Sequence, residues 1–328
     1  MKQPILFLAV TLAIAACATG RKSSPPIPRT GKAYDLAGEQ QLPDRKPEEH
    51  EGLHNLYHLS DDIVSGGEPE GDAAFERLGA MGIKTILSVD GKAPDAATAA
   101  RHGIRYVHVP IRYAGITEEE RLEIAKTFRE LEGPFYVHCF HGKHRGPAAA
   151  ALGRVVLDGV PRELAIAEMR QYCGTSGKYE GLYSTIAFGD VPSEEATEAC
   201  AFDFAPAHRF KGFRQAMIDI SRSFETAEKL AKNGWKATDE HPDANAANEA
   251  RRTAESFAQA VALDEVRSRP EDFRGWLADS VEESKQLSQL LDRQAKGDAA
   301  AGEEAVKALR TLKASCTACH TKYRNEGY

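Results

Sequence analysis

Cys139 and Arg145 lie six positions apart in the segment 138–146, which reads HCFHGKHRG. A cysteine attacks an electrophile as its thiolate, and positive charge or the start of a helix nearby stabilises that anion. Arginine offers a planar pair of N–H donors that can grip two oxygens of a phosphate group. Cys139 could therefore be a thiolate nucleophile and Arg145 a clamp on phosphate oxygens. The alternative is a buried structural cysteine with an unrelated arginine six positions further on.

Backbone groups are expected to complete an anion cradle around these two side chains. A β-type run at 133–138 leads into the loop, and an alanine-rich helical run at 147–157 leads out of it. In such a turn, successive N–H groups point inward and the helix dipole adds partial positive charge. The residues expected to form the phosphate-binding loop are Phe140, His141, Gly142, Lys143, His144 and Gly146.

The HC-x5-R pattern in this setting resembles the phosphate loop of the cysteine-dependent phosphatases, the tyrosine and dual-specificity superfamily. The segments 82–91, 103–111 and 136–146 extend the resemblance over about 51–190. The resemblance implies a phosphocysteine intermediate that water hydrolyses, and a phosphorylated substrate. It also implies an aspartate that protonates the leaving oxygen, on a loop some distance before the cysteine.

That acid loop is where the sequence departs from the family pattern. It reads IRYAGIT at 111–117 and holds no carboxylate, and Ala114 stands about where an aspartate is expected. Asp90, which ends a neighbouring strand run, and Glu118, the first of three adjacent glutamates, are the candidate replacements. Losing a general acid typically costs about 10²- to 10⁴-fold in rate, and phenolic leaving groups suffer least.

Alternating strand and helix patterns predict the fold that holds these residues. The expected helices are 70–81, 94–101, 118–131, 147–158, 161–172 and 180–187, and the expected strands are 84–89, 104–109 and 133–138. Such alternation predicts an α/β sheet flanked by helices. Active groups in such sheets lie at the carboxyl ends of strands, which is where Cys139 falls.

After Pro206 the pattern changes to amphipathic helices alone, in four stretches at about 213–227, 245–266, 273–291 and 303–323. Short breaks between long amphipathic helices predict an all-α four-helix bundle. The last helix ends in CTACH, with Cys316, Cys319 and His320, the attachment pattern of a c-type haem. A zinc knuckle would need a second pair of ligands that the sequence lacks, whereas a redox-active disulfide stays open.

A four-helix bundle with CxxCH in its last helix resembles the cytochrome c′ and c556 family over about 206–328. The resemblance implies one covalent haem c with His320 as an axial iron ligand. In the c556 branch a methionine on the first helix is the sixth ligand, and Met217 fits that place; Met217 also fits plain core packing. In the c′ branch the distal side binds small gases, so a redox partner or a small gas is the expected partner.

The first 17 residues have the features of a targeting segment and are set apart from the fold. Lys2 precedes an apolar run too short to span a bilayer comfortably, and the run ends before Cys17 in IAAC. That ending resembles a bacterial lipobox, which implies acylation of Cys17; an ordinary secretory signal is the alternative. The expected location is therefore the periplasmic side of a bacterial membrane, and Ala18 is compatible with outer-membrane sorting.

Charge and composition indicate which partners the chain can bind and where its domains begin and end. The net charge of the 328 residues is −7, which implies no general affinity for nucleic acid. The expected order is a signal peptide (1–17), a flexible tether (18–50), the phosphatase-like domain (51–190), a linker (191–205) and the haem domain (206–328). Cys173 and Cys200 could pair in an exported protein, but their spacing does not decide this.

These features predict an exported phosphate-monoester phosphatase coupled to a haem domain for electron transfer or for redox or gas sensing. The alternative is a haem electron-transfer or gas-sensor protein whose phosphatase-like domain binds anions but turns over weakly. The missing carboxylate at 111–117 motivates that alternative.

Overall fold

The computed structural model describes residues 31–36, 40–209, 212–238 and 244–323. The targeting segment and Cys17 lie outside these ranges, so the lipid anchor stays a prediction. Within the described ranges, no helix has the length and apolar character needed to cross a membrane.

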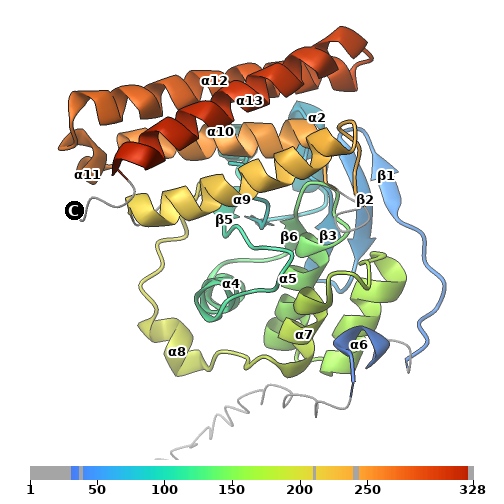
Figure 1. Ribbon diagram of the computed structural model, residues 1–328. Coiled ribbons are helices and arrows are strands. Elements are labelled where there is room, and N and C mark those ends of the chain that lie inside the picture. Colours follow the sequence, from blue (N-terminus) through green and yellow to red (C-terminus); the bar gives the residue numbers. More distant parts are fainter. Residues whose placement is uncertain (1–30, 37–39, 210–211, 239–243, 324–328) are drawn as a thin grey trace, which may run out of the picture.

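A six-stranded sheet forms the centre of the N-terminal part of the chain (Figure 1). Its strands, in spatial order, are β1 (Glu48–His50), β2 (Leu53–His58), β3 (Ile63–Gly66), β6 (Phe135–His138), β4 (Thr85–Ser88) and β5 (Arg105–His108). The first three strands pair antiparallel, and the last four run parallel. His138 pairs with Gly66 on one side and Ser88 on the other, so Cys139 emerges at the carboxyl edge between two strands.

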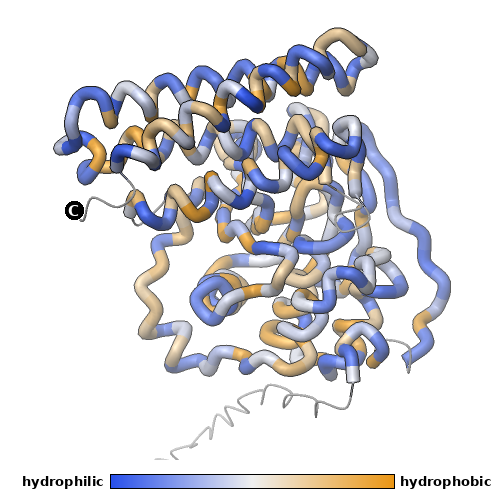
Figure 2. Tube along the Cα trace, in the orientation of Figure 1, coloured by the Kyte–Doolittle hydropathy of each residue, from blue (hydrophilic) through white to orange (hydrophobic). Residues whose placement is uncertain are grey.

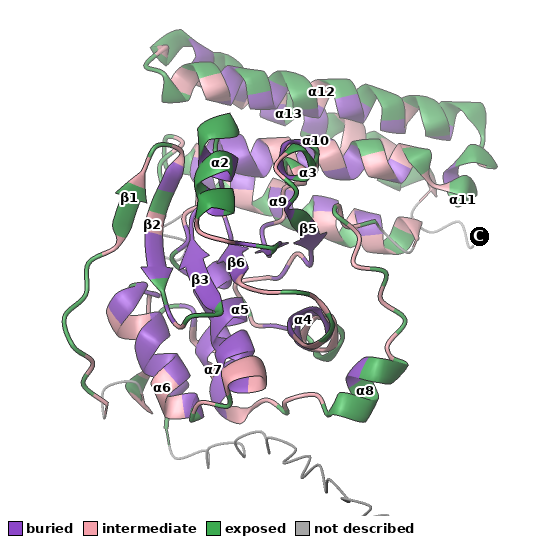
Figure 3. Cartoon of the chain, turned by 180° about the vertical axis from the view of Figure 1, so that it is seen from behind, coloured by how far each residue is buried: buried purple, intermediate pink, exposed green. Residues whose placement is uncertain are grey.

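Helices cover both faces of this sheet (Figures 1 and 3). They are α2 (Asp72–Ala80), α3 (Ala96–Arg101), α4 (Glu118–Glu130), α5 (Arg145–Gly153), α6 (Arg162–Ala167) and α7 (Glu180–Phe188), and π-helical turns extend α5 and α6. Successive strand residues point to opposite faces. Ile86 therefore packs in one apolar cluster with Phe75 of α2, while Leu87 packs in another with Phe128 of α4.

Residues 31–36 and 40–50 depart from the predicted flexible tether. Helix α1 (Ala33–Leu36) packs against the phosphatase-like domain, where Ala33 is fully buried and its N–H donates to Glu180 Oε1 at 2.6 Å. The Tyr34 ring packs edge-on against Tyr183, and β1 joins the sheet. The polar composition was misleading because a few apolar contacts and strand hydrogen bonds are enough to dock the segment.

The predicted linker is ordered in a similar way. It contains a short helix, α8 (Glu194–Ala199), that lies along α4. Lys126 Nζ donates to the Thr197 carbonyl at 2.8 Å, and Arg129 Nη1 donates to the Ser193 carbonyl at 2.9 Å. Two long basic side chains of α4 thus hold the segment in place. Cys173 and Cys200, both among the described residues, are not joined in a disulfide.

The C-terminal helical region comprises α9 (Phe213–Lys232), α10 (Ala246–Ala262), the short α11 (Asp264–Arg267), α12 (Glu271–Ala295) and α13 (Ala299–Tyr323). Hydrophobic and hydrophilic residues alternate along the long helices, as expected of amphipathic helices (Figure 2). Their apolar sides share one core that includes Ile220, Phe257 and Leu291. Helices α9 and α10 lie over the edge of the sheet where the parallel strands end (Figure 1).

Candidate active site

The loop between β6 and α5 has its carbonyl groups turned outward. The Phe140 carbonyl accepts from the backbone N–H of Glu68 at 3.0 Å, and the His141 carbonyl accepts from Asn55 Nδ2 at 3.0 Å. The Lys143 carbonyl accepts from Thr175 Oγ1 at 2.7 Å. These three carbonyls accept from groups outside the loop, which is the orientation that an anion cradle of N–H groups requires.

Gly142 permits the tight turn of this loop. Its φ of 70° lies in the left-handed region, and a Cβ there would lie 2.2 Å from the carbonyl carbon of Gly66. Only glycine tolerates both the conformation and the close approach to the end of β3. The loop predicted from sequence is therefore present, and α5 begins at Arg145 as expected.

Arg145 is held at the cradle by Asp90. Arg145 Nη2 donates to Asp90 Oδ2 at 2.5 Å, and the same oxygen accepts from the Phe140 N–H at 3.2 Å. Arg145 Nε is buried and has no hydrogen-bond partner. A buried orphan donor costs about 1–3 kcal/mol, so its presence in a native cradle points to an anion that would accept from it.

Cys139, the first residue after β6, is only 2% exposed. Burial lowers the pKa of Arg145, but Asp90, Tyr113 and Cys139 together more than offset this and raise that pKa well above its ordinary value. Cys139 and Arg145 are therefore close enough to interact electrostatically. The pair predicted from the HC-x5-R spacing is brought together at the carboxyl edge of the sheet.

An aromatic cover lies over Arg145. The Tyr113 ring faces the guanidinium at 4.6 Å and stacks on the Tyr179 ring at a centroid distance of 4.6 Å. His144 of the phosphate loop contacts the same Tyr179 ring, also at 4.6 Å. Sequence reasoning missed Tyr113, although it immediately precedes Ala114, where the acid was expected.

Asp90, one of the two candidate acids, is excluded from that role by its ionisation. Burial raises its pKa, but Arg145 and the Lys92 N–H, which donates to Oδ1 at 2.9 Å, outweigh burial and hold that pKa far below the usual range. A general acid must carry a proton at the working pH. Asp90 is a carboxylate there, and its place in the site is to orient Arg145.

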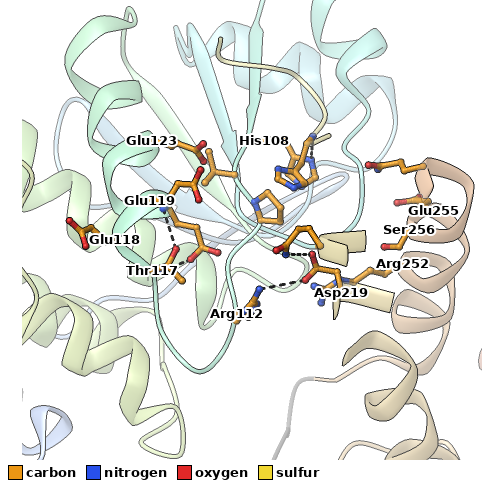
Figure 4. A pocket seen from close by; sticks show the side chains of 17 residues that line it. His108, Arg112, Thr117, Glu118, Glu119, Glu123, Asp219, Arg252, Glu255 and Ser256 are labelled. Atoms are coloured by element: carbon orange, nitrogen blue, oxygen red, sulfur yellow. Dashed lines mark hydrogen bonds and ion pairs between the residues drawn. The ribbon is translucent and has the colours of Figure 1, made fainter. Parts of the chain in front are cut away.

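Glu118, the second candidate, is exposed at the first residue of α4. It lines a cleft of about 440 Å³ between the phosphatase-like domain and the helical region. In Figure 4 its side chain points away from Arg112 and Asp219. Glu120 of the same glutamate run caps the N-terminus of α4. Thr117 Oγ1 accepts from the Glu120 N–H at 3.3 Å, and Glu120 Oε2 accepts from the Thr117 N–H at 2.7 Å.

Two buried histidines beside the cradle are neutral. The Cys139 carbonyl can only accept, so His138 Nδ1–H donates to it at 3.2 Å and His138 Nε2 accepts from the Tyr106 hydroxyl at 2.7 Å. Similarly, His108 Nδ1 accepts from the His208 N–H at 3.0 Å, which leaves Nε2–H to donate to the Asp90 carbonyl at 2.8 Å. Burial lowers the pKa of each imidazole to about 4.

We expect the free energy of unfolding to fall as the pH decreases from about 6.5 to about 4. In this window the unfolded chain binds a proton at His108 and His138 while the folded chain does not, so each histidine contributes a loss of up to about 1.4 kcal/mol per pH unit. Urea unfolding across this window measures the slope. His108→Asn should flatten it, whereas the exposed His54→Gln should not; equal slopes in all three proteins would contradict the assignment.

A second cleft lies in the helical region, on the side of α9 and α10 away from the sheet. It holds about 210 Å³ and is lined mainly by apolar side chains, and the residues that line it include Met217 of α9 and Cys316, Cys319 and His320 of α13. Burial raises the pKa of Cys316 to about 11 and also raises that of Cys319, so both thiols are protonated. Met217 also packs against the core of the region. Among the described residues, no cluster of three His, Cys, Asp or Glu side chains could hold a metal ion.

Comparison with known proteins relates the N-terminal region to phosphatases. The dual specificity protein phosphatase TpbA of Pseudomonas aeruginosa strain UCBPP-PA14 is 30% identical over 121 residues, which are 36% of this chain and 54% of TpbA. TpbA of strain PAO1 is 29% identical over 120 residues, 35% of this chain and 53% of that protein. The chain thus spans about half the length of the curated relatives it matches. No model of a known protein family matches the chain.

Solved structures resemble the same region. The crystal structure of P. aeruginosa TpbA aligns with a TM-score of 0.39 at 23% identity, covering 50% of this chain and all (100%) of that one. The core catalytic domain of the PP-IP phosphatase SIW14 from S. cerevisiae, in complex with citrate, aligns with a TM-score of 0.37 at 18% identity, covering 48% of this chain and 93% of that one. In sequence, the N-terminal region of the chain resembles the dual specificity protein phosphatase TpbA over 121 residues, and a helical region follows it.

Proposed function

We propose that the chain is an exported phosphate-monoester phosphatase that works through a phosphocysteine at Cys139. The observation that carries this proposal is the buried Arg145 Nε, an unpartnered donor in a loop whose carbonyls are turned away. Arg145 Nη2, already fixed by Asp90, would present the second arm of the guanidinium fork to the phosphate.

The reaction would proceed in two displacements. The Cys139 thiolate attacks phosphorus, an S–P bond forms, and the bond to the leaving oxygen breaks with its electron pair. Water then attacks the phosphocysteine, the S–P bond breaks, and inorganic phosphate and the thiolate are released. The loop N–H groups and Arg145 stabilise the charge on the transferring oxygens in both steps.

Rapid acid quenching during turnover of an aryl phosphate tests this mechanism. We expect labelled phosphate on Cys139 in a pre-steady-state burst, located by peptide mass spectrometry. Cys173→Ser is a matched control, because Cys173 is a buried cysteine of the same domain whose pKa burial raises far above its ordinary value. Turnover without label on Cys139 would reject the mechanism.

We propose further that the helical region is a cytochrome c′/c556-like four-helix bundle that carries one covalent haem c. The residues of the second cleft suit that group, since two thiols, an imidazole and the Met217 thioether line it together with apolar side chains. When bound, the haem would supply one-electron or gas-binding chemistry. Cys316 and Cys319 would tether it, His320 would hold the iron, and Met217 would be the candidate sixth ligand.

Removing both tethering thiols gives a clear expected result. In the Cys316→Ser/Cys319→Ser variant, haem should separate from the chain on a denaturing gel, because no thioether bond can form. The unaltered chain should retain about one haem per chain through the same gel. Cys200→Ser is the control and should keep its haem. Haem lost equally from all three proteins would contradict covalent attachment.

A second function is favoured by the acid loop and by Asp90. With Ala114 at the expected acid position and Asp90 ionised, the domain could bind phosphate yet turn it over weakly. The protein would then act as a haem electron carrier or gas sensor with an anion-responsive domain. Vanadate binding with turnover no faster than that of Cys139→Ser would favour this function over the first.

Localisation rests on the sequence alone. We propose that acylation at Cys17 anchors the protein on the periplasmic side of a bacterial membrane, with the outer membrane favoured by Ala18. Metabolic labelling with a fatty-acid analogue, lost in Cys17→Ser, tests the anchor.

A further inference from the structure

Helix α10 of the helical region contacts the loop that carries Asp90. The Arg252 side chain lies against Gly91, so closely that a Cβ at position 91 would be 2.2 Å from Arg252 Nε. One turn further along the helix, Glu255 Oε2 accepts from the Ala93 N–H at 2.9 Å. The two contacts fix the backbone of this loop from outside the phosphatase-like domain.

The same loop determines where Asp90 sits. Asp90 Oδ1 accepts from the Lys92 N–H at 2.9 Å, while Oδ2 reaches Arg145 and the Phe140 N–H. A shift of residues 91–93 would therefore move the carboxylate that orients Arg145. Misplacement of about 1 Å in such a supporting group can cost about 10²-fold in rate.

Charge adds to this geometry. Lys92, which follows Gly91, pairs with Glu68 at 2.5 Å, and the Glu68 N–H donates to the Phe140 carbonyl of the phosphate loop. Two guanidinium groups act on Asp90: Arg145 from its own domain and Arg252 from α10. Both favour the ionised form of the Asp90 carboxyl.

Contacts at β5, the neighbouring strand, also join the phosphatase-like domain to residues that follow it in the chain. Arg112, in the loop after β5, lies 3.6 Å from Asp219 of α9, as Figure 4 shows. His108, at the end of β5, accepts from the His208 N–H and donates to the Asp90 carbonyl. The loop after β4, which carries Asp90, and the loop after β5, which carries Arg112, are therefore both held by residues beyond position 205.

The side of α10 opposite Arg252 and Glu255 lines the second cleft. Phe257 lines the cleft that holds Cys316, Cys319 and His320. At about 100° per residue, Phe257 lies roughly 160° around the helix from Glu255 and 140° from Arg252. One helix thus separates the two sites and contacts both.

We propose that Arg252 and Glu255 of α10 are positioning residues of the phosphatase site, which hold residues 91–93 and, through Asp90, set Arg145. The helical region is then part of the catalytic unit, and α10 is the element that contacts both the second cleft and the loop that carries Asp90. This inference rests on the proposed phosphatase function.

Variants of α10 and of Gly91 in the full chain test the proposal. Arg252→Ala and Glu255→Ala remove the contacts, and Gly91→Ala pushes Arg252 away without changing α10. Arg251→Ala is the matched control, because the neighbouring Arg251 pairs with Asp292 inside the helical region at 2.9 Å. We expect kcat for an aryl phosphate to fall about 10- to 100-fold in the first three variants and to stay unchanged in the control.

Two further readouts separate positioning from a loss of folding. Arg252→Lys keeps a long cationic side chain at this position, so it should restore part of the turnover that Arg252→Ala loses. Orthovanadate affinity, measured by calorimetry, should weaken in the same variants even if turnover proves negligible. If Arg252→Ala and Gly91→Ala match Arg251→Ala in turnover and in vanadate affinity, the proposal is wrong.

Discussion

Replacing Cys139 with serine should lower kcat for an aryl phosphate by about 10⁴- to 10⁶-fold, the scale of loss when a nucleophile is removed. A neutral hydroxyl at position 139 has no general base to activate it, since the nearby Asp90 carboxylate is bonded to Arg145 and the Phe140 N–H. Steady-state assays with p-nitrophenyl phosphate measure the effect.

Binding should survive this substitution. The loop N–H groups and Arg145 are untouched, so Cys139→Ser should still bind inorganic phosphate, and calorimetry can compare its affinity with that of the unaltered chain. An Arg145→Ala variant should lose both binding and turnover. Residual turnover in Cys139→Ser comparable to that of the unaltered chain would show that another group attacks phosphorus.

Introducing aspartate at position 114 should increase the rate with poor leaving groups by about 10²- to 10⁴-fold. Ala114 is exposed on the loop that also carries Tyr113, whose ring covers Arg145, so a longer side chain can be accommodated there. A carboxyl at this position could protonate the leaving oxygen of an alkyl phosphate. Aryl phosphates should gain much less, because a phenolate leaves readily without a proton.

Ala114→Asn is the matched control, since it has the same shape but no acidic proton. The ratio of alkyl to aryl phosphate turnover, measured across pH, separates the two variants. The aspartate variant should also gain a basic limb in its pH profile, where the carboxyl loses its proton. Equal gains in both variants would mean that loop packing, and not proton donation, limits the rate.

The phosphate loop could be predicted from sequence because its determinants are local. Cys139, Gly142 and Arg145 lie within seven consecutive positions, and the strand before them and the helix after them follow from local periodicity. The long helices of the C-terminal region were predictable for the same reason, since α9, α10, α12 and α13 each carry an apolar stripe.

Contacts between distant segments could not be predicted in this way. Asp90 was singled out for its carboxylate, but its ionisation depends on Arg145, which is 55 positions away and meets it only in the folded chain. Arg252 and Glu255 lie on a helix that sequence analysis assigned to a separate domain, and nothing in their spacing points toward Gly91 or Ala93. Composition also misled for Ala33 and Tyr34, whose docking depends on partners in α7.

The depth of Cys139 decides which reagents can reach it. With 2% of the residue exposed, a Tyr113 ring over Arg145 and α10 braced against the adjacent loop, bulky alkylating agents have no direct approach to the sulfur. An oxidant must also reach the sulfur of Cys139 before it can react. The rate of oxidation would therefore depend on how often the helical region separates from the phosphatase-like domain. In the exported phosphatase that we propose, the stability of the interface between the phosphatase-like domain and the helical region would therefore protect Cys139 from oxidation.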